Sequence, residues 1–117
     1  MLKTIRLELA RNPGYPEGSP RHGYEIVAPL DADGYIDLEE WRKNRSACRV
    51  RRFWGDQPDE QGELIHGRRG WAISYVPGEA DDERIFRLDR HVFQVGEYIS
   101  ISEPDDVTYT FKIVSIT

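Results

Sequence analysis

The chain of 117 residues is long enough for one hydrophobic core and too short for two, so we expect a single domain over residues 1–117. Aromatic residues make up 11% of the sequence and hydrophobic residues 38%, which argues against a disordered chain. The net charge of -5 argues against a protein that meets nucleic acid with its whole surface. The single cysteine, Cys48, excludes an intramolecular disulfide and the cysteine-rich zinc motifs.

The start of the chain does not resemble a targeting segment. Residues 1–10 alternate apolar and charged side chains, whereas a secretory signal needs an unbroken apolar run. No later stretch approaches the roughly twenty apolar residues of a membrane-spanning helix. We therefore expect a cytoplasmic protein with no membrane partner.

Two strands and a loop are predicted at the beginning of the chain. Residues 2–11 alternate apolar and polar side chains with the period of two that is typical of a half-buried strand. Residues 12–20 contain three prolines and two glycines and are predicted to form a loop. A second strand is expected over residues 23–28, ending at Pro29.

One short helix is predicted at about residues 37–45. Asp37 is followed three residues later by Glu40, which is the spacing of an acidic capping box, and basic residues follow near the end of the segment. Residues 48–54 are predicted to form the next strand, with a β-bulge at Arg52 and Phe53 where strict alternation breaks.

The second half of the chain is predicted to be a series of short strands. We expect a turn at 55–63, paired strands at 64–66 and 71–76, an acidic turn at 77–83 and a strand at 85–88. The strongest hairpin pattern is formed by residues 95–102 and 107–116, which flank a polar turn. The predicted fold class is α+β: a mostly antiparallel, strongly bent sheet or a small, partly open barrel with one short helix.

An acidic segment at residues 31–40 resembles the second half of a calcium-binding EF-hand loop. Aligning Gly34 with the glycine of that loop places acidic side chains at four ligand positions, but Pro29 falls at the first and has no side-chain oxygen. We interpret the segment as a turn that leads into a capped helix. We therefore predict no metal and no cofactor.

The middle of the chain mixes arginine with aromatic residues, a composition that suits single-stranded nucleic acid or RNA. The segment contains Trp41, Arg42, Lys43, Arg45, Arg49, Arg51, Arg52, Phe53, Trp54, Arg68, Arg69 and Trp71. The competing interpretation is that the rings belong to the core and that the arginines are solvated or paired with nearby acids.

The three histidines support an alternative from another class, a small metal-dependent or hydrolytic enzyme. His22, His66 and His91 lie on different predicted segments, and no two have the spacing of a metal-binding motif. Such an enzyme would need at least two of these rings to converge. Cys48 lies in a predicted strand and is expected to be a buried, inert thiol.

The absence of a convergent catalytic set favours a small, non-enzymatic binding or interaction module over an enzyme. Its partner is a protein or a small molecule, nucleic acid is not excluded, and a monomer or a weak homodimer paired through sheet edges is expected. The predicted ligand-binding residues are Tyr15, His22, Tyr24, Arg49, Arg51, Arg68 and Trp71, with the proline-rich loop as a lid.

Two resemblances bear on these expectations. Residues 91–116, with VGEYISI at 95–101 and YTFKIV at 109–114, resemble the F-x-V-G-D strand, turn and strand block of PUA-like barrels, with Glu97 in place of the aspartate. This resemblance implies a barrel-like fold, and such barrels are often associated with RNA. Through residues 5–45, 48–54 and 96–101 the chain is also similar to a group of small uncharacterised proteobacterial proteins. That similarity implies a self-contained bacterial domain and transfers no functional residue.

Overall fold

Eight antiparallel strands form the body of the molecule in the computed structural model, which describes residues 2–68, 70–74, 85–88, 92–103 and 107–117. The strands are β1 (Leu2–Leu9), β2 (Ser19–Pro29), β3 (Arg49–Trp54), β4 (Gln57–Gly67), β5 (Gly70–Ser74), β6 (Ile85–Leu88), β7 (Tyr98–Ser102) and β8 (Thr108–Ile116). The helical segments in the same part of the chain are α1 (Leu38–Lys43) and η1 (Arg45–Ala47).

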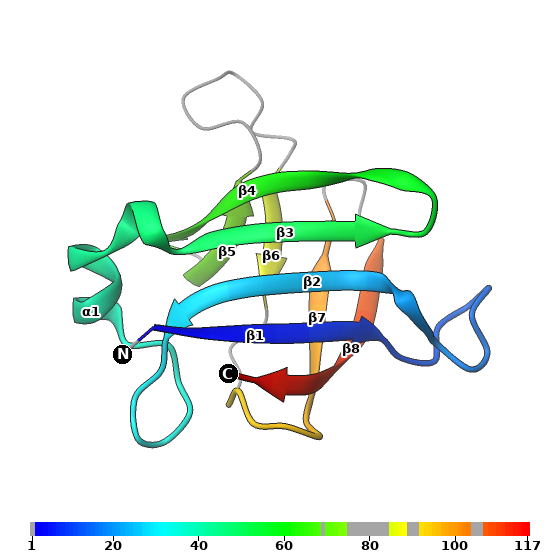
Figure 1. The fold of residues 1–117 in the computed structure, drawn as a ribbon, viewed down its shortest axis with the longest axis horizontal. Coiled ribbons are helices and arrows are strands. Elements are labelled where there is room, and N and C mark those ends of the chain that lie inside the picture. Colours follow the sequence, from blue (N-terminus) through cyan, green and yellow to red (C-terminus); the bar gives the residue numbers. More distant parts are fainter. Residues whose placement is uncertain (1, 69, 75–84, 89–91, 104–106) are drawn as a thin grey trace.

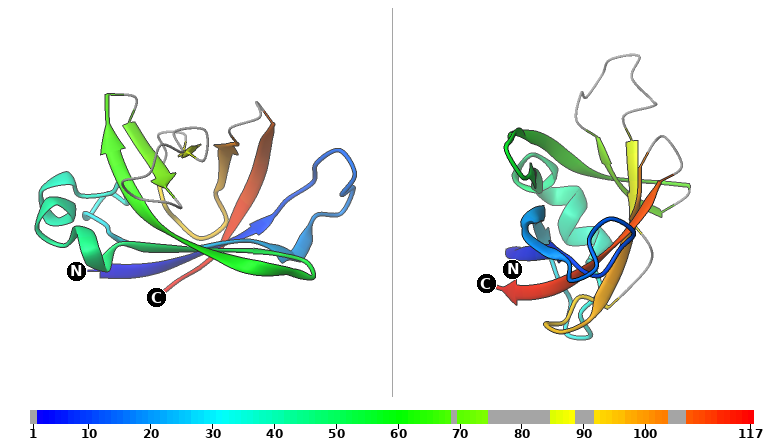
Figure 2. Two further views of the ribbon diagram at one scale, coloured as in Figure 1. Left: turned by 90° about the horizontal axis from the view of Figure 1, so that it is seen from above. Right: turned by 90° about the vertical axis from the view of Figure 1, so that its right-hand side faces the viewer.

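Each strand pairs with the next strand in the chain, and β8 pairs back with β1, so the hydrogen-bonded order closes as a barrel (Figure 1). The shortest seam is β6–β7, where the described register is Arg87 with Ser102 and Leu88 with Ile101. The curved wall is clearest in the view from above in Figure 2. Because the order is closed, none of the described strands offers a free edge for the predicted edge-to-edge dimer.

The prediction of an α+β domain is wrong, because the helical part is too small to form a layer. The helix expected at about residues 37–45 is reduced to the six residues of α1. Asp37 accepts a hydrogen bond from the Glu40 N–H at 3.1 Å, as a helix N-cap does, but Asn44 ends the helix by donating its side-chain N–H to the Glu40 carbonyl at 2.8 Å. In the described part of the chain, no helix is long and apolar enough to cross a membrane.

The turn predicted at residues 55–63 is also wrong, because β4 begins at Gln57, directly after the bend at Gly55 and Asp56. The polar side chains that suggested a turn instead pair with β3. Asp59 accepts a hydrogen bond from Arg51 at 2.7 Å, and Glu60 lies 3.7 Å from the guanidinium of the next arginine, Arg52. A strand on the wall of a barrel can therefore be polar where its neighbour supplies complementary charge.

Several predicted elements are confirmed. The C-terminal hairpin is present as β7 and β8, which pair from Tyr98 with Lys112 to Ser102 with Thr108. The strand predicted at residues 2–11 is β1, and the β3–β4 register shifts where the bulge was predicted. The strand at 85–88 is β6, whereas the predicted acidic turn at 77–83 lies outside the described residues.

Alternate residues of the strands whose side chains the structure describes point into the barrel and form one aliphatic and aromatic core. Its fully buried members include Ile5, Leu7, Tyr24, Ile26, Leu64, Ile73, Ile99, Ile101, Phe111 and Ile113. Trp41 of α1 is 4% exposed and closes one end of this core, where its indole N–H donates to the Leu64 carbonyl at 3.0 Å. We call this the α1 end, and it lies at the left in Figure 1.

Candidate functional site

A groove of about 570 Å³ lies between the proline-rich loop and the outer face of β1, β7 and β8. Its volume falls within the roughly 300–1,000 Å³ of ordinary ligand sites. The lining residues are Glu8, Leu9, Ala10, Arg11, Pro16, Glu17, Tyr98, Thr110, Lys112 and Val114. They come from the two ends of the sequence, because β8 closes the barrel against β1.

The floor of the groove carries a row of polar side chains that crosses three strands. Lys112 of β8 is in register with Glu8 of β1 on one side and with Tyr98 of β7 on the other. The flanking residues Phe111 and Ile113 are fully buried, so strand alternation points Lys112 outward. Tyr98 is 52% exposed, and the row therefore combines a cation with an accessible ring.

The wall of the groove is the proline-rich loop, which Asn12 holds against β8. The side chain of Asn12 donates to the carbonyls of Ala10 and Thr110, both at 2.9 Å, and accepts from the Thr110 N–H at 3.1 Å. Asn12 is only 8% exposed, so its polar atoms depend on these bonds. The segment expected to be a lid is in this structure a wall bonded to the barrel.

Asn12 was not among the predicted functional residues, although the sequence contains a signal for it. An asparagine directly before Pro13 and Gly14 favours a turn in which its side chain bonds to nearby backbone. The backbone confirms a tight turn, since Asn12 and Tyr15 exchange hydrogen bonds at 3.1 and 2.8 Å. The bond to β8 could not be predicted, because Thr110 lies 98 residues away in the sequence.

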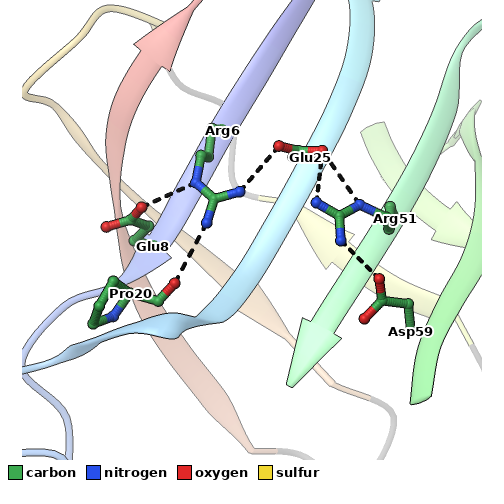
Figure 3. A network of polar contacts seen from close by, with 6 residues as sticks. All are labelled: Arg6, Glu8, Pro20, Glu25, Arg51 and Asp59. Carbon is green, nitrogen blue, oxygen red and sulfur yellow. Dashed lines mark hydrogen bonds and ion pairs between the residues drawn. The ribbon is translucent and has the colours of Figure 1, made fainter. Parts of the chain in front are cut away.

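Glu8, on the floor of the groove, belongs to a chain of ion pairs on the outside of the barrel (Figure 3). Arg6 contacts Glu8 at 2.9 Å and Glu25 at 3.0 Å, and Glu25 in turn contacts Arg51 at 2.8 Å. The hydrogen bond to Glu8 raises the pKa of Arg6, against the opposing effect of burial. Glu8 is therefore paired within the protein, through an arginine that it shares with Glu25.

The same network predicts how stability depends on pH. The hydrogen bond from Arg51 lowers the pKa of Glu25 below its ordinary value of 4.5, although burial acts in the opposite direction. Because the folded pKa is the lower one, the stability from this carboxylate is complete above 4.5 and is lost as the pH falls through the folded pKa. We expect the Glu25→Gln variant to lose less stability than the wild type as the pH is lowered from about 6 to about 3 in thermal unfolding experiments.

The matched control is Glu17→Gln, which removes an exposed carboxylate that forms no ion pair within the described part of the chain. This variant should follow the pH dependence of the wild type. If Glu25→Gln and Glu17→Gln lose the same amount of thermal stability as the pH is lowered, the network does not contribute to stability through Glu25.

The groove also contains charges that are not balanced within the protein. Neither Lys112 nor Arg11 lies within ion-pair distance of a carboxylate in the described part of the chain. Arg11 instead donates to the Pro16 carbonyl at 3.1 Å, which positions its guanidinium on the loop side. Glu17 is the one lining carboxylate without an ion pair among the described residues. The lining charges sum to zero, but two cations and one carboxylate of the groove form no ion pair among the described residues.

A second cluster, of aromatic rings, occupies the barrel end opposite α1. We call the rings of Tyr15, His22, Trp54 and Tyr109 the aromatic end. Their centroids are 5.1 Å apart for Tyr15 and His22, 4.8 Å for His22 and Trp54, and 5.2 Å for Trp54 and Tyr109. All four side chains are half-buried and come from the loop, β2, β3 and β8, so the cluster ties these elements together.

Beneath the aromatic end, the charged side chain of Arg52 lies inside the barrel. Its guanidinium lies 4.2 Å from the centre of the Trp54 ring, contacts Glu103 at 3.0 Å and donates to the Tyr24 hydroxyl at 3.3 Å. Burial lowers the pKa of Arg52, but Tyr24 and Glu103 raise it by more, so the net shift is upward and the side chain stays charged. A buried charge requires such pairing, and Arg52 thereby connects β3 to β2 and to the residue that directly follows β7.

The geometry of the histidines does not favour the enzymatic alternative. His22 is level with Trp54 and Gln57 in the strand register, and His66 lies nine residues further along β4, a distance of about 30 Å. His91 lies outside the described residues. In the described part of the chain, no group of three histidine, cysteine or acidic residues could hold a metal ion.

His22 does form a close pair with a hydroxyl group, Ser19 Oγ, at 2.7 Å from Nδ1. The pair spans three residues of one strand, and Ser19 Oγ also accepts from the Arg21 N–H at 3.2 Å, as in a local turn. Burial lowers the pKa of His22, with smaller contributions in the same direction from Arg21 and Arg52. We interpret this pair as structural, because the described residues place no carboxylate on the imidazole to orient it as a base.

Cys48 is buried in the core, as expected. Removal from water raises the pKa of its thiol. A neutral thiol that solvent does not reach is a poor nucleophile, so Cys48 has a packing role.

The predicted ligand-binding residues do not form one site. Tyr15, His22 and Tyr24 lie at or beneath the aromatic end, Arg51 belongs to the outer network, and Trp71 and Arg68 lie at the α1 end with Arg49 at the start of β3. Of this set the structure brings Tyr15 and His22 into direct contact. The groove contains none of them, because its floor depends on the pairing of β1 with β8.

Comparisons of the chain with family models, curated proteins and solved structures find no match. The resemblances to PUA-like barrels and to small proteobacterial proteins therefore stay predictions.

Proposed function

We propose that the protein is a non-enzymatic binding module that holds a short acidic peptide segment in the groove between the proline-rich loop and β8. The proposal rests on an open groove whose wall, the proline-rich loop, is hydrogen-bonded to the barrel. In this groove Lys112, which has no ion pair among the described residues, lies beside the exposed ring of Tyr98. A groove between a loop and a sheet suits an extended chain, which can lie along it.

The charges of the groove favour an acidic segment over a basic one. Two cations, Lys112 and Arg11, are available to a carboxylate from a ligand, whereas of the two lining carboxylates Glu8 is already held by Arg6 and Glu17 alone is available to a cation. A charge-assisted hydrogen bond is among the stronger polar contacts at an accessible site. Tyr98 and Val114 supply an apolar surface for a neighbouring side chain of the peptide.

Little reorganisation is needed for binding, since the wall is already in place. Asn12 and Arg11 bond the loop to the barrel and to itself, so a ligand does not have to order this segment. A preorganised site loses less conformational entropy when it binds. This supports recognition of a flexible peptide by a rigid surface.

The test is a titration of isotope-labelled protein, followed by NMR, with an acetylated peptide of alternating glutamate and tyrosine residues. Amide signals of residues 8–11, 98 and 110–114 are expected to shift. Lys112→Gln should weaken binding about ten-fold, the effect of losing one charged hydrogen bond. The control Lys43→Gln removes an exposed lysine on α1 and should bind as the wild type does.

The counterpart peptide with glutamine in place of glutamate distinguishes charge recognition from nonspecific contact with tyrosine. It should bind at least ten-fold more weakly than the acidic peptide. Equal affinity for the two peptides, or an equal effect of Lys112→Gln and Lys43→Gln, would rule out the groove as an acidic-peptide site.

A further inference from the structure

The arginines of the molecule fall into two groups according to their ion pairs. Arg6, Arg21, Arg42, Arg51 and Arg52 each pair with at least one carboxylate. Arg11, Arg45, Arg49 and Arg68 have no carboxylate at ion-pair distance within the described ranges of the chain, and Arg11 belongs to the groove described above. Arg45 follows α1, Arg49 begins β3 and Arg68 follows β4. All three side chains are exposed and lie in the α1 half of the barrel.

Aromatic rings accompany these arginines. His66 and Trp71 face each other across the β4–β5 hairpin, with ring centroids 4.5 Å apart, and the edge of Trp71 meets the buried Trp41 at 5.2 Å. The Arg45 guanidinium lies 4.6 Å from the centre of the Trp41 ring. His66 is exposed and Trp71 is half-buried, so this ring pair is anchored on the core and accessible from outside.

The β4–β5 hairpin, which carries Arg68, is uncrowded at its two glycines as far as the described residues are concerned. Gly67 pairs with Gly70, and apart from chain neighbours no atom of the described residues lies within 4 Å of the position that a Cβ would take on either glycine. Gly70 has a positive φ of 92°, a conformation that suits glycine in a tight turn. The described residues therefore leave room for a large ligand beside Gly67 and Gly70.

We propose that these residues form a binding surface for single-stranded nucleic acid at the α1 end, with bases on the His66–Trp71 pair and phosphates on Arg45, Arg49 and Arg68. Accessible rings beside cations are what single strands require, because stacking and phosphate contacts act together. An acidic protein partner could pair with the arginines, but it would have no bases to stack on the faces of the rings. The surface uses none of Arg51, Arg52 or Trp54, which the fold already engages.

The local charge limits the affinity. Glu63 lies in register with Arg49, and the whole chain has a net charge of -5. We therefore expect a dissociation constant between roughly 1 and 100 μM at low salt, which is in the range of nonspecific binding.

The test is fluorescence anisotropy of a labelled deoxythymidine 15-mer with the whole protein. Three phosphate contacts predict a slope of about -2 for the logarithm of the association constant against that of the salt concentration, so affinity should fall about 20-fold from 20 to 80 mM salt. Arg49→Ala and Arg68→Ala should each weaken binding and reduce the slope by about 0.7. Arg21→Ala, which removes an exposed arginine from the start of β2, should do neither.

Further outcomes separate this surface from the groove. Lys112→Gln should leave binding of the 15-mer unchanged, and the acidic peptide should not compete with it. A duplex of the same length should bind more weakly, because its bases are not available for stacking. No binding at 20 mM salt, equal effects of Arg68→Ala and Arg21→Ala, or competition by the acidic peptide would overturn the proposal.

Discussion

Replacement of Arg52 by methionine is expected to lower the free energy of unfolding by about 3 kcal/mol. The substitution removes the guanidinium that contacts Glu103 at 3.0 Å, and it leaves that carboxylate, which is only 13% exposed, without this counter-charge. It also removes the stacking of Arg52 on Trp54 and its bond to Tyr24. Methionine keeps a similar length of apolar chain, so the loss reports mainly on the charge. Urea denaturation measures the effect.

The neighbouring residue provides a matched control. Arg51 carries the same side chain on the same strand, but it points outward and its ion pairs with Glu25 and Asp59 are about one-third exposed. Arg51→Met should therefore cost about 1 kcal/mol or less. Adding Glu103→Gln to Arg52→Met should recover part of the loss, because it removes the charge of the buried carboxylate that has lost its contact with Arg52. If Arg51→Met and Arg52→Met lower the free energy of unfolding equally, the buried Arg52–Glu103 pair contributes no more to stability than the exposed pairs of Arg51.

This contrast explains a limit of prediction from the sequence. Arg51 and Arg52 are adjacent and chemically identical, and the sequence placed both in one basic segment. A strand sends neighbouring residues to opposite faces, so Arg52 lies inside the barrel and Arg51 lies outside. Which face is inside depends on the β2–β3 and β3–β4 registers, which no local pattern specifies.

What the sequence did predict is local. The alternation of apolar and polar residues predicted β1, and two β-branched segments around a polar turn predicted the β7–β8 hairpin. The capping residue Asp37 predicted the start of α1. These signals depend on residues within a few positions of one another. The predicted helix was too long, since capping patterns locate where a helix starts better than how far it extends.

The groove could not be predicted, for a physical reason. Its floor pairs Glu8 with Lys112, and its wall is held by the bond between Asn12 and Thr110. Both contacts exist only because the two ends of the chain meet when the barrel closes. The aromatic end has the same origin, because Tyr15, Trp54 and Tyr109 come from three distant segments. The class was wrong because a helix of six residues forms no layer, and the first part of β4 was missed because its polar residues, which pair with β3, have the composition of a turn.

Replacement of Gly23 by alanine should destabilise the barrel by at least about 3 kcal/mol, because it requires backbone movement. A Cβ at this position would collide with the carbonyl oxygen of Leu7 and lie 2.9 Å from the ring of Phe53. Phe53 lies over Gly23 on the outside of the barrel and is itself covered by Arg6 and Arg51, whose guanidinium groups lie 4.5 and 5.1 Å from its ring centre. The ring therefore cannot move away without disturbing the network that holds Glu8.

Gly67→Ala is the matched control for Gly23→Ala. It makes the same substitution on a strand of the same barrel, but at a position where a Cβ would meet no atom of the described residues within 4 Å, chain neighbours aside. The control should change the free energy of unfolding by less than about 1 kcal/mol in the same urea experiment. If Gly23→Ala unfolds at the same urea concentration as Gly67→Ala, β1, β2 and Phe53 are not packed as closely as the structure requires. Because Phe53 supports Arg6, a folded Gly23→Ala variant should also bind the acidic peptide more weakly.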